Sequence, residues 1–135
     1  GTLSAVPNTT LDTLIHLKNN GFRLGVMSNT VFMKRWMHFL PVLNVTGLLD
    51  AIVFSTDIGL RKPNQIAYNT VLNELDARKE QALFVGDRIV EDIRGPRKFG
   101  FAATALTHEF RQECDEQSEA DIILTELSEL LPFVR

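Results

Sequence analysis

Two aspartates that follow an apolar run are the residues of this chain best suited to chemistry. The apolar run Ala82–Val85 has the length and composition of a short buried strand and ends abruptly at Gly86-Asp87, and Asp92 follows shortly after. If this run is a strand of an open α/β sheet, ligands bind beyond its carboxyl end. Carboxylate oxygens at that place could hold a hard cation such as Mg²⁺. Spacing alone leaves an alternative open, in which Asp87 starts a turn and Asp92 caps a helix.

Two other positions carry complementary polar groups. Ser28-Asn29 follows the apolar stretch Phe22–Met27, and Lys62 stands directly before Pro63, where a helix is expected to begin. A phosphoryl group needs hydrogen-bond donors and positive charge around its oxygens. Taken singly, Ser28 reads equally well as a loop hydroxyl and Lys62 as a solvated surface lysine. Taken together with the aspartates, they predict a phosphate pocket with a bound metal ion.

A parallel sheet covered by helices is the framework that would bring these groups together. Strands are expected over 22–27, 51–54, 82–85, 101–106 and 120–124. Helical patterns alternate with these strands along the whole chain, which indicates parallel pairing with both faces covered. The predicted fold is therefore a three-layer, doubly wound α/β domain whose strands end in polar residues at one edge.

Local signals predict where the helices begin and end. Thr9 or Thr10 can cap a first helix that stops at Asn20-Gly21, and Thr125 can cap the last helix, which ends before Pro132. The others are a helix over Val31–Leu40, one after Pro63, and a short one after Asp87 that Gly95-Pro96 interrupts or restarts.

Composition bounds the class of protein. The 135 residues suit one domain, with 44% hydrophobic and 23% charged residues. No apolar run approaches the ~20 residues that span a bilayer. A net charge of −3 gives no general attraction to nucleic acid or anionic membranes. The single Cys114 cannot form an internal disulfide, and Gly1 to Val6 lack a secretory signal, so we expect a cytoplasmic protein.

The order of these motifs resembles the haloacid dehalogenase-like hydrolases, most of which are magnesium-dependent phosphatases. The resemblance runs from about Pro7 to Leu131. It rests on the second motif at Leu24–Asn29, the third at Gly59–Pro63, and the fourth at Gly86–Asp92 with trailing glycines at 95 and 100. Pro96 departs from the family, which usually has a small helix-compatible residue there.

The resemblance implies a role for each candidate residue. Ser28 would hydrogen-bond the phosphate, and the backbone amide of Asn29 would add a donor. Lys62 would neutralise the phosphate and orient the nucleophile. Asp87 would bind Mg²⁺, and Asp92 would assist the metal directly or through water. The reaction of the family passes through an aspartyl-phosphate, which needs a further carboxylate.

That carboxylate is missing from the sequence. The family's first motif, Asp-x-Asp after a first strand, has no match among the remaining aspartates, which are Asp12, Asp50, Asp57, Asp76, Asp115 and Asp121. Gly1-Thr2-Leu3 matches residues that commonly follow the motif, and it equally resembles an ordinary linker. The family's first strand is central, between the strands that end at Ser28 and Asp87. Its absence would leave the edges of these two strands unpaired. Our hypothesis is that a longer natural chain, another polypeptide or copy, or a rearranged sheet fills the position of this strand.

Residues 1–135 form a single predicted domain, and one interpretation is that this domain is a fragment of a longer chain. Two functions remain open for it. The first is a magnesium-dependent phosphoric monoester hydrolase core that acts on a small phosphorylated substrate, with its nucleophile outside the given sequence. The alternative is a catalytically inactive domain that binds phosphate, metal or another protein. A receiver-type signalling domain is disfavoured, because its acidic residues precede its hydroxyl and lysine.

Overall fold

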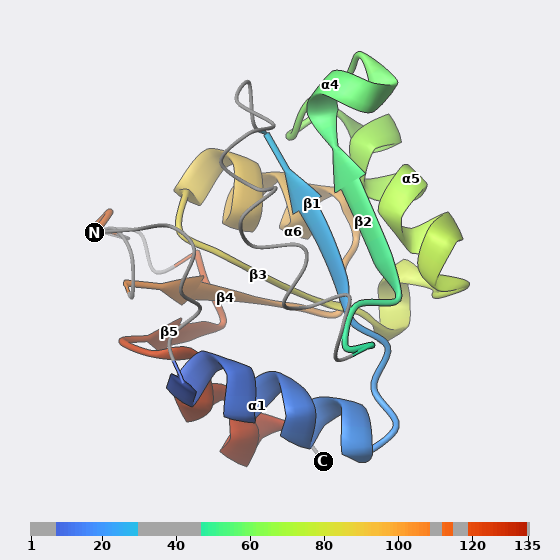
Figure 1. Ribbon diagram of the computed structural model, residues 1–135. Coiled ribbons are helices and arrows are strands. Elements are labelled where there is room, and N and C mark those ends of the chain that lie inside the picture. The colour runs from blue at the N-terminus through green and yellow to red at the C-terminus, as the bar shows by residue number, and fades with distance from the viewer. Residues whose placement is uncertain (1–7, 30–46, 109–111, 115–118, 135) are drawn as a thin grey trace.

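The computed structural model of the protein describes residues 8–29, 47–108, 112–114 and 119–134 (Figure 1). The predicted helix Val31–Leu40 lies outside these ranges. The elements, in chain order, are α1 (Asn8–Asn19), β1 (Gly25–Ser28), β2 (Ala51–Phe54), α4 (Ser55–Ile58), α5 (Gln65–Leu75), η1 (Lys79–Gln81), β3 (Leu83–Gly86), η2 (Ile89–Arg94), α6 (Gly95–Phe99), β4 (Ala103–Thr107), β5 (Ile122–Leu124) and η3 (Leu127–Phe133).

The strands form two parallel sheets rather than one. β1 pairs with β2, and β3, β4 and β5 pair in that order. Helix α5 packs on the β1–β2 sheet and contacts α6, while α1 and η3 contact each other beside β5. The predicted α/β fold with parallel strands is therefore confirmed. Within the described residues no strand joins the two sheets, which splay apart in Figure 1 with β1 toward β3.

Burial of the strands reflects this break. All residues of β4 but the first are buried, and β4 has a partner on each side. In β3 every residue is only half-buried, and in β1 only Met27 is buried. The sequence predicted a buried strand at this position of β3, so its degree of burial was wrong. Both strands thus expose more surface than β4, because within the described residues each of them pairs with a strand on one side only.

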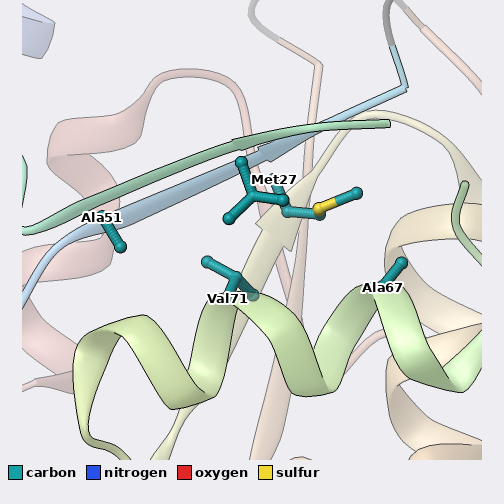
Figure 2. Packing of buried hydrophobic residues seen from close by; sticks show 5 residues of the cluster. Met27, Ala51, Ala67 and Val71 are labelled. Carbon is teal, nitrogen blue, oxygen red and sulfur yellow. The ribbon is translucent and has the colours of Figure 1, made fainter. Parts of the chain in front are cut away.

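One hydrophobic cluster joins β1 and β2 to α5 (Figure 2). Met27, Ala51 and Val53 pack against Ala67 and Val71, and all five are buried. Ala67 and Val71 are four residues apart and so share one face of the helix. The parallel register places Met27 opposite Val53, so both strands contribute to the same layer. This packing fixes where the polar end of β1 lies relative to the start of α5.

Asp50 explains why β1 begins later than predicted. Its carboxylate accepts a hydrogen bond from the backbone N–H of Leu24 at 2.8 Å and forms an ion pair with Lys18. The amide of Leu24 is thus bonded to a side chain, and strand pairing starts at Gly25, opposite Ala51. Partial burial alone would raise the pKa of Asp50, but hydrogen bonds from Lys18 and Leu24 hold it below its usual value.

Several predicted helix ends differ from the structure. α1 already includes Thr9 and Thr10, so neither is its cap. The last helix is a 3₁₀ helix capped by Glu126 instead of Thr125, in a capping box with Glu129, and Pro132 lies inside it. After β2 the chain forms a single helical turn, α4, that ends at Gly59 with φ 70°. After Asp87 the chain forms a π-type turn, η2, and restarts as α6 at Gly95-Pro96.

We expect Tyr68→Phe to destabilise the protein by about 1–3 kcal/mol. Tyr68 is fully buried, and its hydroxyl donates to the carbonyl of Glu91 at 2.6 Å. Burial, with the nearby charges of Asp92 and Glu91, raises the pKa of this hydroxyl, which therefore remains a donor. Urea denaturation should show a lower midpoint at an unchanged slope.

Thr70→Ala is the matched control on the same helix. Its hydroxyl donates to the carbonyl of Ile66 in an exposed bond, so its loss should change stability by less than about 0.5 kcal/mol. Equal effects of the two substitutions would show that burial of the Tyr68 hydrogen bond is unimportant.

Candidate functional site

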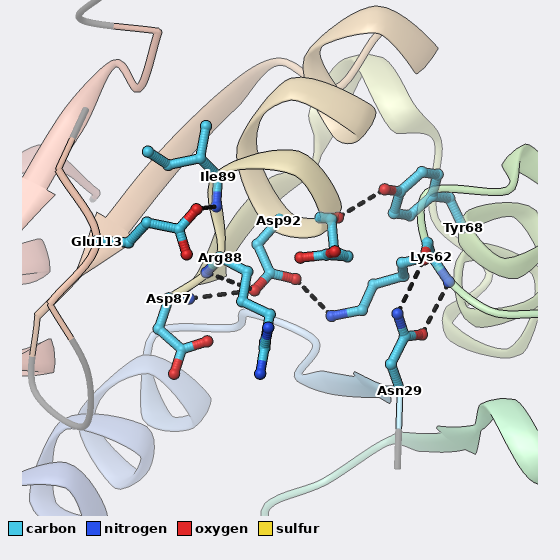
Figure 3. A network of polar contacts seen from close by, with 9 residues as sticks. Asn29, Lys62, Tyr68, Asp87, Arg88, Ile89, Asp92 and Glu113 are labelled. Carbon is cyan, nitrogen blue, oxygen red and sulfur yellow. Dashed lines mark hydrogen bonds and ion pairs between the residues drawn. The ribbon is translucent and has the colours of Figure 1, made fainter. Parts of the chain in front are cut away.

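Lys62 is held from two directions at the carboxyl ends of the parallel strands (Figure 3). The side chain of Asn29, directly after β1, accepts a hydrogen bond from the backbone N–H of Lys62 at 2.8 Å. It also donates to the backbone carbonyl of Lys62 at 2.9 Å. The Lys62 side chain is buried, its ammonium pairs with Asp92, and it lies 5.3 Å from the centre of the Phe84 ring. Lys62 is therefore not a solvated surface lysine.

Asp92 joins Lys62 to the loop that carries Asp87. One oxygen of the buried Asp92 carboxylate bonds the Lys62 ammonium. The other accepts backbone N–H bonds from Asp87 and Arg88, each at 3.1 Å. Asp92 lies within η2 and is not its cap, so the helix-cap alternative is excluded for it. Both oxygens of this carboxylate are thus engaged, which favours a role in positioning the site.

Asp87 offers the carboxylate that suits a cation. It follows β3 and is half-buried, and no hydrogen bond to its side chain is found within the described ranges. Across those ranges no group of three or more His, Cys, Asp or Glu side chains could hold a metal ion. Mg²⁺ commonly uses one or two carboxylates and takes its remaining oxygens from substrate and water. Asp87 could supply one such carboxylate, whereas both oxygens of Asp92 are already engaged.

Ser28 ends β1 one residue before Asn29 and is half-buried. In the part of the chain that the structure describes, no hydrogen bond links it to Asn29, Lys62 or the two aspartates. The structure therefore joins four of the five predicted residues in one polar network and places Ser28 beside it in the chain.

Two further residues lie next to this network, and the sequence did not predict their roles. Glu113, in the segment after β4, accepts a hydrogen bond from the N–H of Ile89 at 3.1 Å and so supports the loop after Asp87. No local signal marks it, because the contact joins distant segments. Gly86 was quoted only as part of a motif, yet a Cβ there would overlap the Asp92 side chain. Its place directly before Asp87 was the available clue.

The fold and the site together define an α/β protein with a polar site at the carboxyl ends of parallel strands. Residues 3–106 match the family model of the haloacid dehalogenase-like hydrolases. Because the match covers most of the chain, the protein belongs to this family. The resemblance that the three motifs indicated is therefore confirmed.

Relatives with names include several phosphatases. A glyceraldehyde 3-phosphate phosphatase of Methanothermobacter thermautotrophicus is 34% identical over 110 residues, which are 82% of this chain and 48% of that protein. A phosphoglycolate phosphatase of Pectobacterium atrosepticum is 28% identical over 91% of this chain and 52% of its own length. The chain thus spans about half the length of these relatives.

Solved structures support the same fold. A HAD phosphatase from Thermococcus onnurineus superposes with a TM-score of 0.81 at 20% identity, over 95% of this chain and 57% of that one. Among the described residues, no helix is long and apolar enough to cross a membrane.

Proposed function

We propose that the protein is the core of a magnesium-dependent phosphoric monoester hydrolase that acts through an aspartyl-phosphate, with the nucleophile outside the given sequence. The observation that carries the proposal is the network of Asn29, Lys62, Asp87 and Asp92 at the carboxyl ends of parallel strands. Through Asp92 it links a buried cation to the loop that carries the Asp87 carboxylate, and phosphoryl transfer needs positive charge and metal-binding oxygens of these kinds. Family membership and the names of the relatives support it.

Each side chain has a defined task in this proposal. Lys62 neutralises the phosphate oxygens and orients the attacking carboxylate, while Ser28 and the backbone N–H of Asn29 donate hydrogen bonds to the phosphate. Asp92 keeps the Lys62 ammonium and the Asp87 loop in register. Asp87, with Asp92 through water, would hold Mg²⁺, which supplies charge neutralisation at the phosphate when bound.

The substrate class that we propose is a small phosphorylated metabolite. The named relatives act on glyceraldehyde 3-phosphate or phosphoglycolate, both small phosphate esters. The described site provides groups for the phosphate only, so it supports this class and no single compound.

A second candidate function is an inactive domain that binds phosphate, metal or a protein partner. The observation that favours it is that both oxygens of the Asp92 carboxylate are already bonded, one to the Lys62 ammonium and the other to the N–H groups of Asp87 and Arg88. The two functions are separated by an assay of p-nitrophenyl phosphate hydrolysis with Mg²⁺. We compare this chain with a version extended at Gly1 by a strand that ends in Asp-x-Asp. Hydrolysis by the extended version alone supports the enzyme, and none by either supports the binding domain. Hydrolysis by the unextended chain that survives Asp87→Asn would contradict both.

We expect Mg²⁺ to raise the melting temperature of the protein by about 3–5 °C at a tenfold excess over its Kd. Asp87→Asn should abolish this shift, because the amide removes the charge of the proposed ligand. Asp76→Asn is the matched control, since Asp76 is exposed at the end of α5 and its left-handed conformation suits asparagine. An equal Mg²⁺ shift in the protein and in Asp87→Asn would rule out the metal role of Asp87.

A further inference from the structure

The side chain of Asn29 makes a two-point contact with the main chain of a single residue. Its carbonyl oxygen accepts from the N–H of Lys62, and its amide nitrogen donates to the C=O of the same residue. This pattern satisfies both polar backbone groups of Lys62 at once. An aspartate could not donate to the carbonyl, and an alanine could do neither.

Lys62 differs in burial from the residues next to it in the chain. Arg61, Pro63 and Asn64 are all exposed, while Lys62 between them is buried. The side chain of Asn64 caps α5 by accepting a hydrogen bond from the N–H of Ile66. In the described part of the chain, the two hydrogen bonds from Asn29 are those that join this short segment to the end of β1.

The contact continues as an unbroken series across the site. From Asn29 it passes to the main chain of Lys62, then through the lysine ammonium to Asp92, and from Asp92 to the N–H groups of Asp87 and Arg88. Figure 3 shows these side chains in one line. Asn29 follows β1 and Asp87 follows β3, so the series connects the two separated sheets at their carboxyl ends.

We infer that the Asn29 side chain is a positioning residue, which fixes the Lys62 ammonium on Asp92 and thereby ties the β1 edge to the β3 edge. A lysine side chain has many accessible rotamers, so a fixed main chain helps to place its ammonium. The sequence suggested only the backbone amide of Asn29 as a phosphate donor. The importance of this role for catalysis rests on the proposed function, whereas the positioning itself does not.

Acetylation of Lys62 by acetic anhydride, followed residue by residue with mass spectrometry, tests the inference without requiring enzymatic activity. In the unaltered protein Lys62 should react more slowly than the exposed Lys98. Asn29→Ala should speed acetylation of Lys62 about tenfold, because loss of these hydrogen bonds favours local opening by roughly that factor. Asn29→Asp, which keeps one bond and nearly the same shape, should also raise the rate.

Asn64→Ala is the control for a merely structural effect. It removes the cap of α5 two residues from Lys62 and should lower stability, but it should change Lys62 acetylation by less than about twofold. An unchanged Lys62 rate in a folded Asn29 variant would overturn the inference. An equal increase in Asn64→Ala would overturn it too. Faster Lys62 acetylation in the Asn29 variants, together with no phosphatase activity in the extended chain, would support the positioning role of Asn29 and reject the enzyme function.

Discussion

Asp92→Ala is expected to lower the free energy of unfolding by about 3–5 kcal/mol, because it leaves a buried ammonium without its partner. The Lys62 and Asp92 side chains are only 9% and 6% exposed. The substitution also removes the acceptor for the N–H groups of Asp87 and Arg88. Urea denaturation measures this loss of free energy of unfolding. The dependence of that free energy on urea concentration should stay constant if the variant exposes the same surface on unfolding.

Two controls separate burial of the charge from removal of a carboxylate. Glu80→Ala breaks the exposed pair with Arg78 and should cost less than about 1 kcal/mol. The double variant Lys62→Met/Asp92→Ala removes both charges, so it should be more stable than Asp92→Ala alone. If Asp92→Ala lowers the free energy of unfolding no more than Glu80→Ala does, burial of the Lys62–Asp92 pair does not increase its importance for stability.

The pair also shows how far the sequence could predict the arrangement of the candidate site residues. Ser28-Asn29 and Asp87 each follow an apolar run, Lys62 stands directly before the expected start of a helix, and an open parallel sheet brings such positions to one edge. Their approach therefore follows from local patterns and topology. The burial of Lys62 does not, because the residues around it are exposed and its shelter comes from segments far away in the chain. The role of Glu113 could not be predicted for the same reason, since its contact with Ile89 joins segments that are distant in sequence.

The strands were predicted better than their ends. The expected range of β2 coincides with the observed strand, since Ala51–Phe54 is apolar throughout and is bounded by Asp50 and Ser55. The start of β1 was missed because Asp50, remote in sequence, binds the amide of Leu24. The half-burial of β3 was missed for a different reason, since composition reports how apolar a strand is and says nothing of its neighbours.

The break between the sheets gives the polar network a further importance. A central strand would normally pair with both β1 and β3 and hold their ends together. Among the described residues, the contacts from Asn29 to Asp92 make that connection at the site's edge. An added strand with Asp-x-Asp would therefore meet a site whose cation and acidic loop are already in place, so we expect its carboxylates to complete the site without large rearrangement.

Gly86→Ala is expected to cost about 3 kcal/mol of stability and to disrupt the site, because the added methyl group has no room. A Cβ at position 86 would overlap both the carboxylate and the Cβ of Asp92. Relief requires Asp92 to move, which breaks its bonds to Lys62 and to the backbone of Asp87. The backbone of Gly86 is extended and paired with Leu106, so the expected loss arises from crowding and not from φ.

Gly25→Ala tests the same change in another strand. There the Cβ would crowd the Cδ1, Cδ2 and Cγ atoms of the flexible Leu75 side chain, which can shift, so we expect a loss of about 1 kcal/mol or less. Acetylation of Lys62 should rise in Gly86→Ala and stay unchanged in Gly25→Ala, because only the first displaces Asp92. If both alanines cost the same and neither exposes Lys62, then the close approach of Gly86 to Asp92 does not hold the lysine in place.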